Sequence, residues 1–248
     1  MDSTTAYLLR LGDNSLILSQ RLSAWCGRGP ALEEDMALTN VALDLLGQTR
    51  MWYGYASDQE NAGRDENLLA FHRDAHDFHN CLLVEQDNGS YADTLMRQFL
   101  FDAFHYFQLG ALAGCSDERI AAIAAKSLKE VRYHFRHSLD WLVRLGDGTA
   151  QSHARSQAAV DHLMPYTSEY WSQAAINNIA NSETAAGMAT LQASWDELVN
   201  DALEEAGLQR PRVMAKPPQG KNGQHSEHLA PLLADMQSLA RAHPQAQW

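Results

Sequence analysis

The chain has 248 residues, of which 45% are hydrophobic and 20% charged, so it can bury a substantial core and is not disordered. Acidic residues outnumber basic ones by 31 to 19, and the formal net charge of −12 disfavours nucleic acids and anionic membranes as partners. No run of about 18 apolar residues predicts a membrane-spanning helix, and residues 1–5 lack the basic start of a signal peptide. The cysteines Cys26, Cys81 and Cys115 lie outside any CxxC motif, so we expect a cytoplasmic protein with free thiols.

The order of the predicted elements indicates an all-α protein. Residues 31–164 contain no proline and are rich in alanine, leucine, glutamine and arginine, which favours long helices. Segments of alternating β-branched residues are absent, so the fold class is all-α, with long helices joined by short loops as in a bundle. Apolar side chains at steps of three and four, with glycine-rich breaks between them, predict helices in this order: 8–25, 33–55, 67–86, 93–113, 117–145, 152–163, 166–178, 183–206 and 226–242.

The C-terminal part differs in composition from the rest of the chain. Residues 208–224 carry four basic residues, three prolines and no acid, which indicates an extended basic arm. We therefore expect a helical-bundle domain over 1–206, followed by the arm and a C-terminal helix over 207–248. The last helix has an apolar face that must be buried. It packs either on its own bundle or on a partner, and the sequence leaves both possibilities open.

A long-helix bundle with inward polar residues raises the question of a di-iron centre. Ferritin-like di-iron proteins place a Glu on two helices and Glu-x-x-His on two others, because residues three apart share one face. Glu-x-x-His occurs nowhere in this chain. Asp44 is followed three residues later by Gly47 rather than His, and His134 is preceded three residues earlier by Val131 rather than Glu. Two metals need about six protein ligands, so the inward candidates, which also include Asp102 and Glu130, are too few.

Two other patterns are weaker candidates for metal sites. Asp102 and His105 form the one Asp-x-x-His pair, which cannot hold two metals by itself. His72, His76 and His79 fall on one face of the predicted helix 67–86, with Asp74 and Asp77 nearby. HxxxH on a helix can bind zinc, but HExxH is absent, and we expect these histidines to face solvent or another protein chain.

Several segments resemble one known family along essentially the whole chain. The most specific are 129–138 (KEVRYHFRHS), continuing through Asp140-Trp141 and 144–149, and the tail 223–248 with His228-Leu229 and Met236-Gln237. The runs 97–104, 7–13 and 42–50 agree. These segments resemble the C subunits of bacterial 1,2-phenylacetyl-CoA epoxidases.

The resemblance implies a fold, a complex and a set of partners. It implies a ferritin-like subunit of a phenylacetate-degrading monooxygenase, paired with a catalytic di-iron A subunit that epoxidises the ring of phenylacetyl-CoA. A small B subunit and a reductase E subunit with NADPH, flavin and iron–sulfur groups complete the complex, and homo-association through the A–C pair is possible. C subunits are regarded as structural, so the resemblance implies no catalytic, cofactor-binding or metal-binding residue in this chain.

At most of the positions where the family's metal ligands would stand, this chain has a different residue. Asp44 and Gly47 stand where a Glu and a His would stand, Val131 stands where a second Glu would, and His134 is retained; with Asp102 these are vestigial di-iron positions. We expect Asp44, Glu130 and His134 to point inward and to hydrogen-bond to one another or to a basic residue, because buried charge must be paired.

Three functional hypotheses follow. The first is a non-catalytic scaffold subunit of a di-iron monooxygenase. The second is a self-sufficient di-metal carboxylate enzyme, whose ligands would be Asp44, Asp102, His105, Glu130 and His134. The third is a helical adaptor without an enzyme partner.

Overall fold

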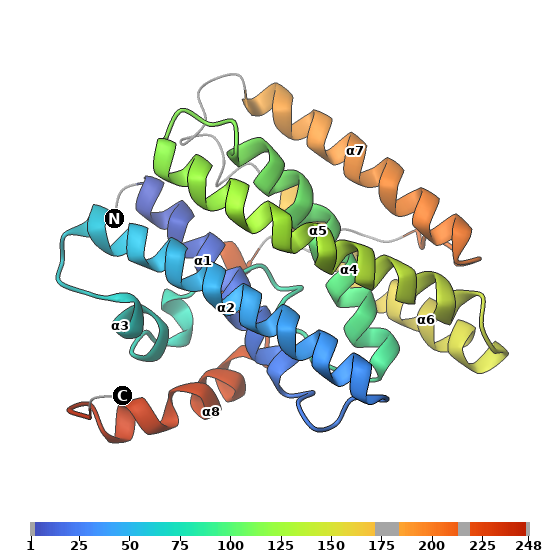
Figure 1. Ribbon diagram of the computed structural model, residues 1–248, viewed down its shortest axis with the longest axis horizontal. Helices are drawn as coiled ribbons and strands as arrows, with labels where there is room; N and C mark the ends of the chain where they lie inside the picture. The colour runs from blue at the N-terminus through green and yellow to red at the C-terminus, as the bar shows by residue number, and fades with distance from the viewer. Residues whose placement is uncertain (1–2, 172–183, 213–218, 247–248) are drawn as a thin grey trace. The chain divides into compact units, whose positions relative to one another are not determined.

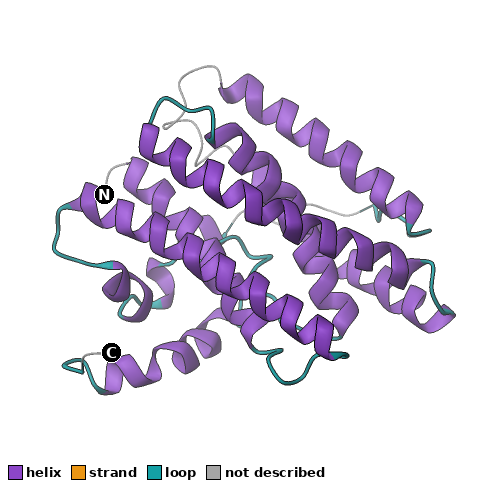
Figure 2. Cartoon of the chain, viewed as in Figure 1, coloured by secondary structure: helices purple, strands orange, loops and turns teal. Residues whose placement is uncertain are grey.

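The computed structural model describes residues 3–171, 184–212 and 219–246. Within these residues every regular element is helical and no strand occurs, which confirms the all-α prediction (Figure 2). None of the described helices is both long and apolar enough to cross a membrane. In chain order the elements are: α1 Ser3–Ser23, α2 Leu32–Glu60, α3 Glu66–Phe71, the 3-10 helix η1 Ala75–Asp77, α4 Tyr91–Leu112, α5 Glu118–Gly146, α6 Ala150–Leu163, the 3-10 helix η2 Met164–Trp171, α7 Thr184–Glu205, the 3-10 helix η3 Gly220–Asn222 and α8 Leu229–Ala242.

The chain divides into two compact units. Unit 1 combines residues 1–87 with 218–248, and unit 2 consists of residues 88–217. Unit 1 contains the hairpin α1–α2 together with α3, η1, η3 and α8, and unit 2 contains the hairpin α4–α5 with α6, η2 and α7 (Figure 1). The domain division at 206/207 expected from the sequence stays a prediction.

The α1–α2 hairpin of unit 1 is organised around a buried ion pair. Asp13 of α1 is fully buried, and the guanidinium of Arg73 donates to its carboxylate. The Tyr53 hydroxyl of α2 donates to the same carboxylate, and the backbone N–H of His79 donates to it at 2.7 Å. The Arg73 guanidinium also stacks on Phe78, 4.1 Å from the ring centroid. The buried acid of α1 is therefore fully paired, as burial requires.

The single helix predicted over 67–86 is wrong. The helix α3 ends at Phe71, and a separate 3-10 turn, η1, follows after Arg73 and Asp74. Arg73 leaves the helical path because its side chain is drawn into the buried pair with Asp13. Beyond η1, residues 78–90 form turns and coil, and the buried residues Phe78, Cys81, Leu82, Leu83 and Val84 lie in this non-helical stretch.

The C-terminal segment packs on its own unit. Gln237 of α8 donates to the backbone carbonyls of Ala70 and Arg73, each at 3.0 Å. Arg241 donates to the Asp74 carboxylate at 2.9 Å. The helix α8 begins at Leu229 rather than near 226, and it buries Leu229 and Leu233. Of the two possibilities left open for this helix, packing on its own chain is the one that the structure shows.

The expected basic arm is only partly described. Residues 213–218 lie outside the described residues. On the unit 2 side, the Arg210 guanidinium donates to Asn200 and Asp196 of α7 and lies over the Trp195 ring. On the unit 1 side, Lys221 is buried within η3.

Unit 2 is built on the α4–α5 hairpin. Ser90 and Asp93 form a capping box at the start of α4, and the Asp117 carboxylate caps α5 by accepting from two backbone N–H groups. The described part of the predicted helix 166–178 is also wrong, because Met164–Trp171 is a 3-10 helix, while residues 172–178 lie outside the described residues.

An aromatic group joins η2 to α4 and α7: Phe104 stacks on Tyr170 at 4.1 Å, and Tyr170 and Trp171 meet Trp195 edge-on.

Candidate functional site

A buried polar cluster lies between α4 and α5 of unit 2. The Asp102 carboxylate accepts a hydrogen bond from Gln98 Nε2 at 2.6 Å and another, on its second oxygen, from Ser138 Oγ at 2.9 Å. His105 and His134 are the other polar members, and both are buried. We refer to these five residues as the Asp102 cluster.

Helix periodicity explains why these side chains meet. Gln98, Asp102 and His105 follow one another at steps of four and three, so they share one face of α4. His134 and Ser138 are four apart on the buried face of α5, which also includes Val131. The two buried faces oppose each other in the hairpin, which brings Ser138 to Asp102 across it.

Burial shifts the pKa values of Asp102 and His105 toward their neutral forms. Complete burial raises the pKa of the Asp102 carboxyl to about 7, against the opposing effects of His134 and the hydrogen bonds from Ser138 and Gln98. Burial, with a smaller contribution from His134, lowers the pKa of His105 to about 3, so this imidazole is neutral. Both shifts favour the uncharged form of the group, because burial penalises the charged one.

The donor set does not fit a di-iron centre. The cluster contains a single carboxylate, Asp102, and both of its oxygens already accept hydrogen bonds from protein side chains. Val131, which offers no ligand atom, is fully buried three residues before His134. One carboxylate and two imidazoles fall short of the four carboxylates and two imidazoles that the ferritin-like pattern requires.

The remaining predicted site residues are less buried than the Asp102 cluster. Asp44 and Gly47 lie on α2 in unit 1, where Asp44 is half-buried and Gly47 exposed. Glu130 is also half-buried, so neither Asp44 nor Glu130 is a core residue, whereas His134 is fully buried as expected. On α5 the buried residues Ser127, Val131 and His134 leave Glu130 at the edge of the buried face, and Glu130 is therefore a poor candidate for a core ligand.

The three histidines expected on one helix face are also dispersed. His72 caps the end of α3, His76 belongs to η1, and His79 lies in the loop that follows, where its backbone N–H binds Asp13. Burial lowers the pKa of His79, with Asp13 opposing the shift. A helical HxxxH site is therefore excluded at these positions.

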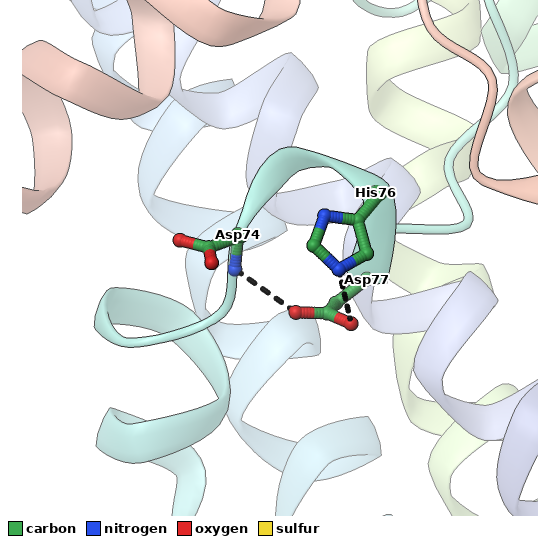
Figure 3. Close-up of side chains that lie close together, drawn as sticks. All are labelled: Asp74, His76 and Asp77. Atoms are coloured by element: carbon green, nitrogen blue, oxygen red, sulfur yellow. Dashed lines mark hydrogen bonds and ion pairs between the residues drawn. The ribbon is translucent and has the colours of Figure 1, made fainter.

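A different small cluster replaces it on the surface. Asp74, His76 and Asp77 form the one group of three potential metal ligands found among the described residues, with ligand atoms within 4.8 Å of one another (Figure 3). All three are exposed, and both acids already have structural roles. The Asp77 carboxylate accepts from the Asp74 backbone N–H at the start of η1, and the Asp74 carboxylate binds Arg241.

Sequence reasoning missed Gln98 and Ser138. The one trace in the sequence is their helical spacing, which is not distinctive by itself: Gln98 lies four residues before Asp102 and Ser138 four residues after His134. Asp13 and Glu85 were also missed. Each is an acid among apolar residues that binds partners distant in the chain, Arg73 for Asp13 and His225 for Glu85.

Comparison with known proteins identifies the family. Residues 1–248 match the family described as phenylacetic acid catabolic protein, and the chain belongs to this family of ferritin-like helical bundles. The chain is similar to the C subunit of the 1,2-phenylacetyl-CoA epoxidase of Escherichia coli (strain K12), with 48% identity over 250 residues and complete coverage of both chains. The resemblance to the epoxidase C subunits is confirmed.

Proposed function

We propose that this chain is a non-catalytic structural subunit of a phenylacetyl-CoA epoxidase in phenylacetate catabolism. Its role is to pair with and stabilise the catalytic di-iron A subunit. The similarity to the C subunit of the Escherichia coli epoxidase over the full length of both chains supports the assignment to such a complex.

The Asp102 cluster is the observation that supports a non-catalytic role. Where a ferritin-like enzyme would hold two irons, this hairpin offers one carboxylate that Gln98 and Ser138 already bind on both oxygens. The alternative, a self-sufficient di-metal enzyme, loses Glu130 and Asp44 as buried ligands. Hydrogen bonds from Gln98 on α4 and from Ser138 on α5 satisfy the cluster's acid, and the bond from Ser138 joins the two helices, so the cluster serves to stabilise the hairpin.

The proposal places the redox groups in other subunits. The di-iron centre belongs to the A subunit, and NADPH, flavin and iron–sulfur chemistry to the reductase E subunit, with the small B subunit as the remaining component. We place the complex in the cytoplasm, where the free thiols of Cys26, Cys81 and Cys115 stay reduced.

Metal content and turnover together test this proposal. The chain expressed alone in iron-rich medium should contain well under one iron per chain. The complex assembled with an Asp102→Asn/His134→Gln double variant should keep its iron content and its epoxidation rate per assembled complex. Glu130→Gln, on the same helix but half-buried, is the matched control for effects on assembly. Close to two irons per isolated chain would overturn the proposal, as would a loss of turnover in a fully assembled, fully iron-loaded variant complex.

A further inference from the structure

The helix α2 has a second apolar face opposite the one that it buries. Its buried side includes Leu38, Leu45 and Trp52. On the opposite side, Leu32, Met36 and Leu43 have exposed fractions of 74%, 58% and 60%. Four of the seven large hydrophobic residues that are exposed in the described chain lie on this one helix, the fourth being Leu46. A helix that is apolar on opposite sides is expected to be covered on both.

Two glycines lie on the same face. At about 100° per residue, Gly47 and Gly54 fall within a sector about 60° wide that also contains Leu32, Met36, Leu43 and the exposed Arg50. We refer to the two glycines and the three apolar residues as the outer stripe of α2. A Cβ atom at either glycine would meet no atom within 4 Å. No contact within the chain therefore requires glycine at these positions, although glycine weakens a helix interior. Glycine does allow a second backbone to approach closely, which suits a docked helix.

The charges around the stripe indicate the kind of partner. The α2 sequence contains six acids and a single base, Arg50, which falls within the same sector as the stripe, while the exposed acids Glu33 and Asp58 lie beside it. A second copy of this chain would bring the same acidic helix and a further net charge of −12. Like charges opposed across an interface disfavour association. The charge complement is a helix whose own apolar stripe is flanked by Lys and Arg.

We propose that the outer stripe of α2 is the surface on which a helix of a different subunit of the same enzyme docks. This inference rests on the proposed function, because that function supplies a complex of several different subunits. The backbone of the partner helix approaches closely over Gly47 and Gly54, its apolar side chains pack against Leu43 and Met36, and its basic residues lie beside the acids of α2.

Gly47→Phe separates docking from folding. Because open space surrounds the position of its Cβ, the variant chain should fold alone, with an unchanged circular dichroism spectrum and an unchanged or slightly higher melting temperature. The phenylalanine ring would nevertheless hold a second helix away from the stripe. We expect the variant to bind the co-expressed epoxidase subunits at least tenfold more weakly than the wild-type chain in affinity co-purification and titration.

A matched pair of leucines provides the second measurement. Leu43→Glu should also abolish co-purification, whereas Leu239→Glu, at a leucine of α8 that is 55% exposed, should leave it intact. If the wild-type chain co-purifies and both the Gly47→Phe and Leu43→Glu chains do so equally well, the inference fails and the proposed function stands. If the wild-type chain does not associate with the other subunits, the proposed function itself fails. If the wild-type chain alone is dimeric and the Leu43→Glu variant is monomeric, then a second copy of this chain covers the outer stripe of α2, and the inference is overturned.

Discussion

The side chains of His225 and Glu85 form a buried pair although they lie 140 residues apart in the chain, with Nδ1 of the imidazole 2.9 Å from the carboxylate. The other ring nitrogen lies 2.9 Å from the backbone carbonyl of Phe78. Because both neighbours are acceptors, both ring nitrogens must carry protons to satisfy them. Burial alone would lower the pKa of His225, but the hydrogen bond and the charge of Glu85 outweigh it, and the pKa is raised above its ordinary value.

The pair predicts a stability that declines as pH rises. A histidine whose pKa is raised by folding contributes stability in full below its unfolded pKa of about 6.5, and loses it as pH rises through the folded value. We expect His225→Gln to cost about 1.5–3 kcal/mol at pH 6 and distinctly less at pH 8.5, measured by urea unfolding. His228→Gln is the control, because its pair with Asp87 is partly exposed to solvent. An equal cost for His225→Gln at both pH values would contradict the assignment of the charge.

Asp102 predicts a second pH effect in a lower window. Its pKa is raised to about 7 by folding, so the native state holds a proton that the unfolded chain releases near pH 4. Stability is therefore highest below the unfolded pKa and falls as pH rises from about 4 to about 7. Asp102→Asn removes this dependence. The free energy of unfolding of the variant, relative to that of the wild-type chain, should rise between pH 5 and pH 8 by at least about 1 kcal/mol. A constant difference across that range would show that Asp102 is ionised throughout.

The Asp13–Arg73 pair should be far more sensitive than a surface pair. Asp13→Ala would leave the buried Arg73 guanidinium without its counter-charge, and we expect a loss of about 3–5 kcal/mol in denaturant unfolding. Glu66→Gln breaks the pair with Arg50, whose atoms are 3.9 Å apart and whose arginine is 73% exposed, and should cost less than about 1 kcal/mol. Comparable costs for the two variants would mean that Arg73 finds another partner.

Two glycines with nearly the same backbone angle distinguish strain from steric overlap. Gly27 has φ of +76° and Gly223 has φ of +75°, a region that costs other residues roughly 1–2 kcal/mol. A Cβ at position 27 would meet nothing, whereas at position 223 it would collide with the backbone carbonyl of His76. Gly223→Ala should therefore lower the melting temperature clearly more than Gly27→Ala. The opposite order would show that the turn at η3 can move away from η1.

The elements that the sequence predicted well are those in which local pattern and tertiary packing agree. On α5, the apolar residues at steps of three and four are the residues that are buried, and His134 lies among them as predicted. The predicted helix 67–86 failed because a long-range contact overrides the local pattern there. Arg73, whose propensity is helical, leaves the helix to pair with Asp13, sixty residues earlier.

The candidate site shows the same limit. Asp102, His105 and His134 were found from their types and spacing, but the partners of Asp102 were not, because glutamine and serine on a helix carry no distinctive pattern. We expected Asp44 and Glu130 to point inward because periodicity alone does not distinguish an acid at the edge of the buried face from an acid within it. The contact between His225 and Glu85 has no local signal at all, since it joins two loops.

Unit 1 is formed by segments from both ends of the chain, and this affects how the protein folds during synthesis. During synthesis, Glu85 emerges from the ribosome long before His225, and at about 5–20 residues per second the intervening 140 residues take roughly 7 to 28 seconds. Throughout that interval the α1–α2 hairpin lacks α8 and the groups that satisfy Glu85, while residues 88–217 can already fold. A chain interrupted before its last thirty residues would carry an unfinished first half beside a finished middle, and such nascent chains are natural substrates for chaperones and proteases.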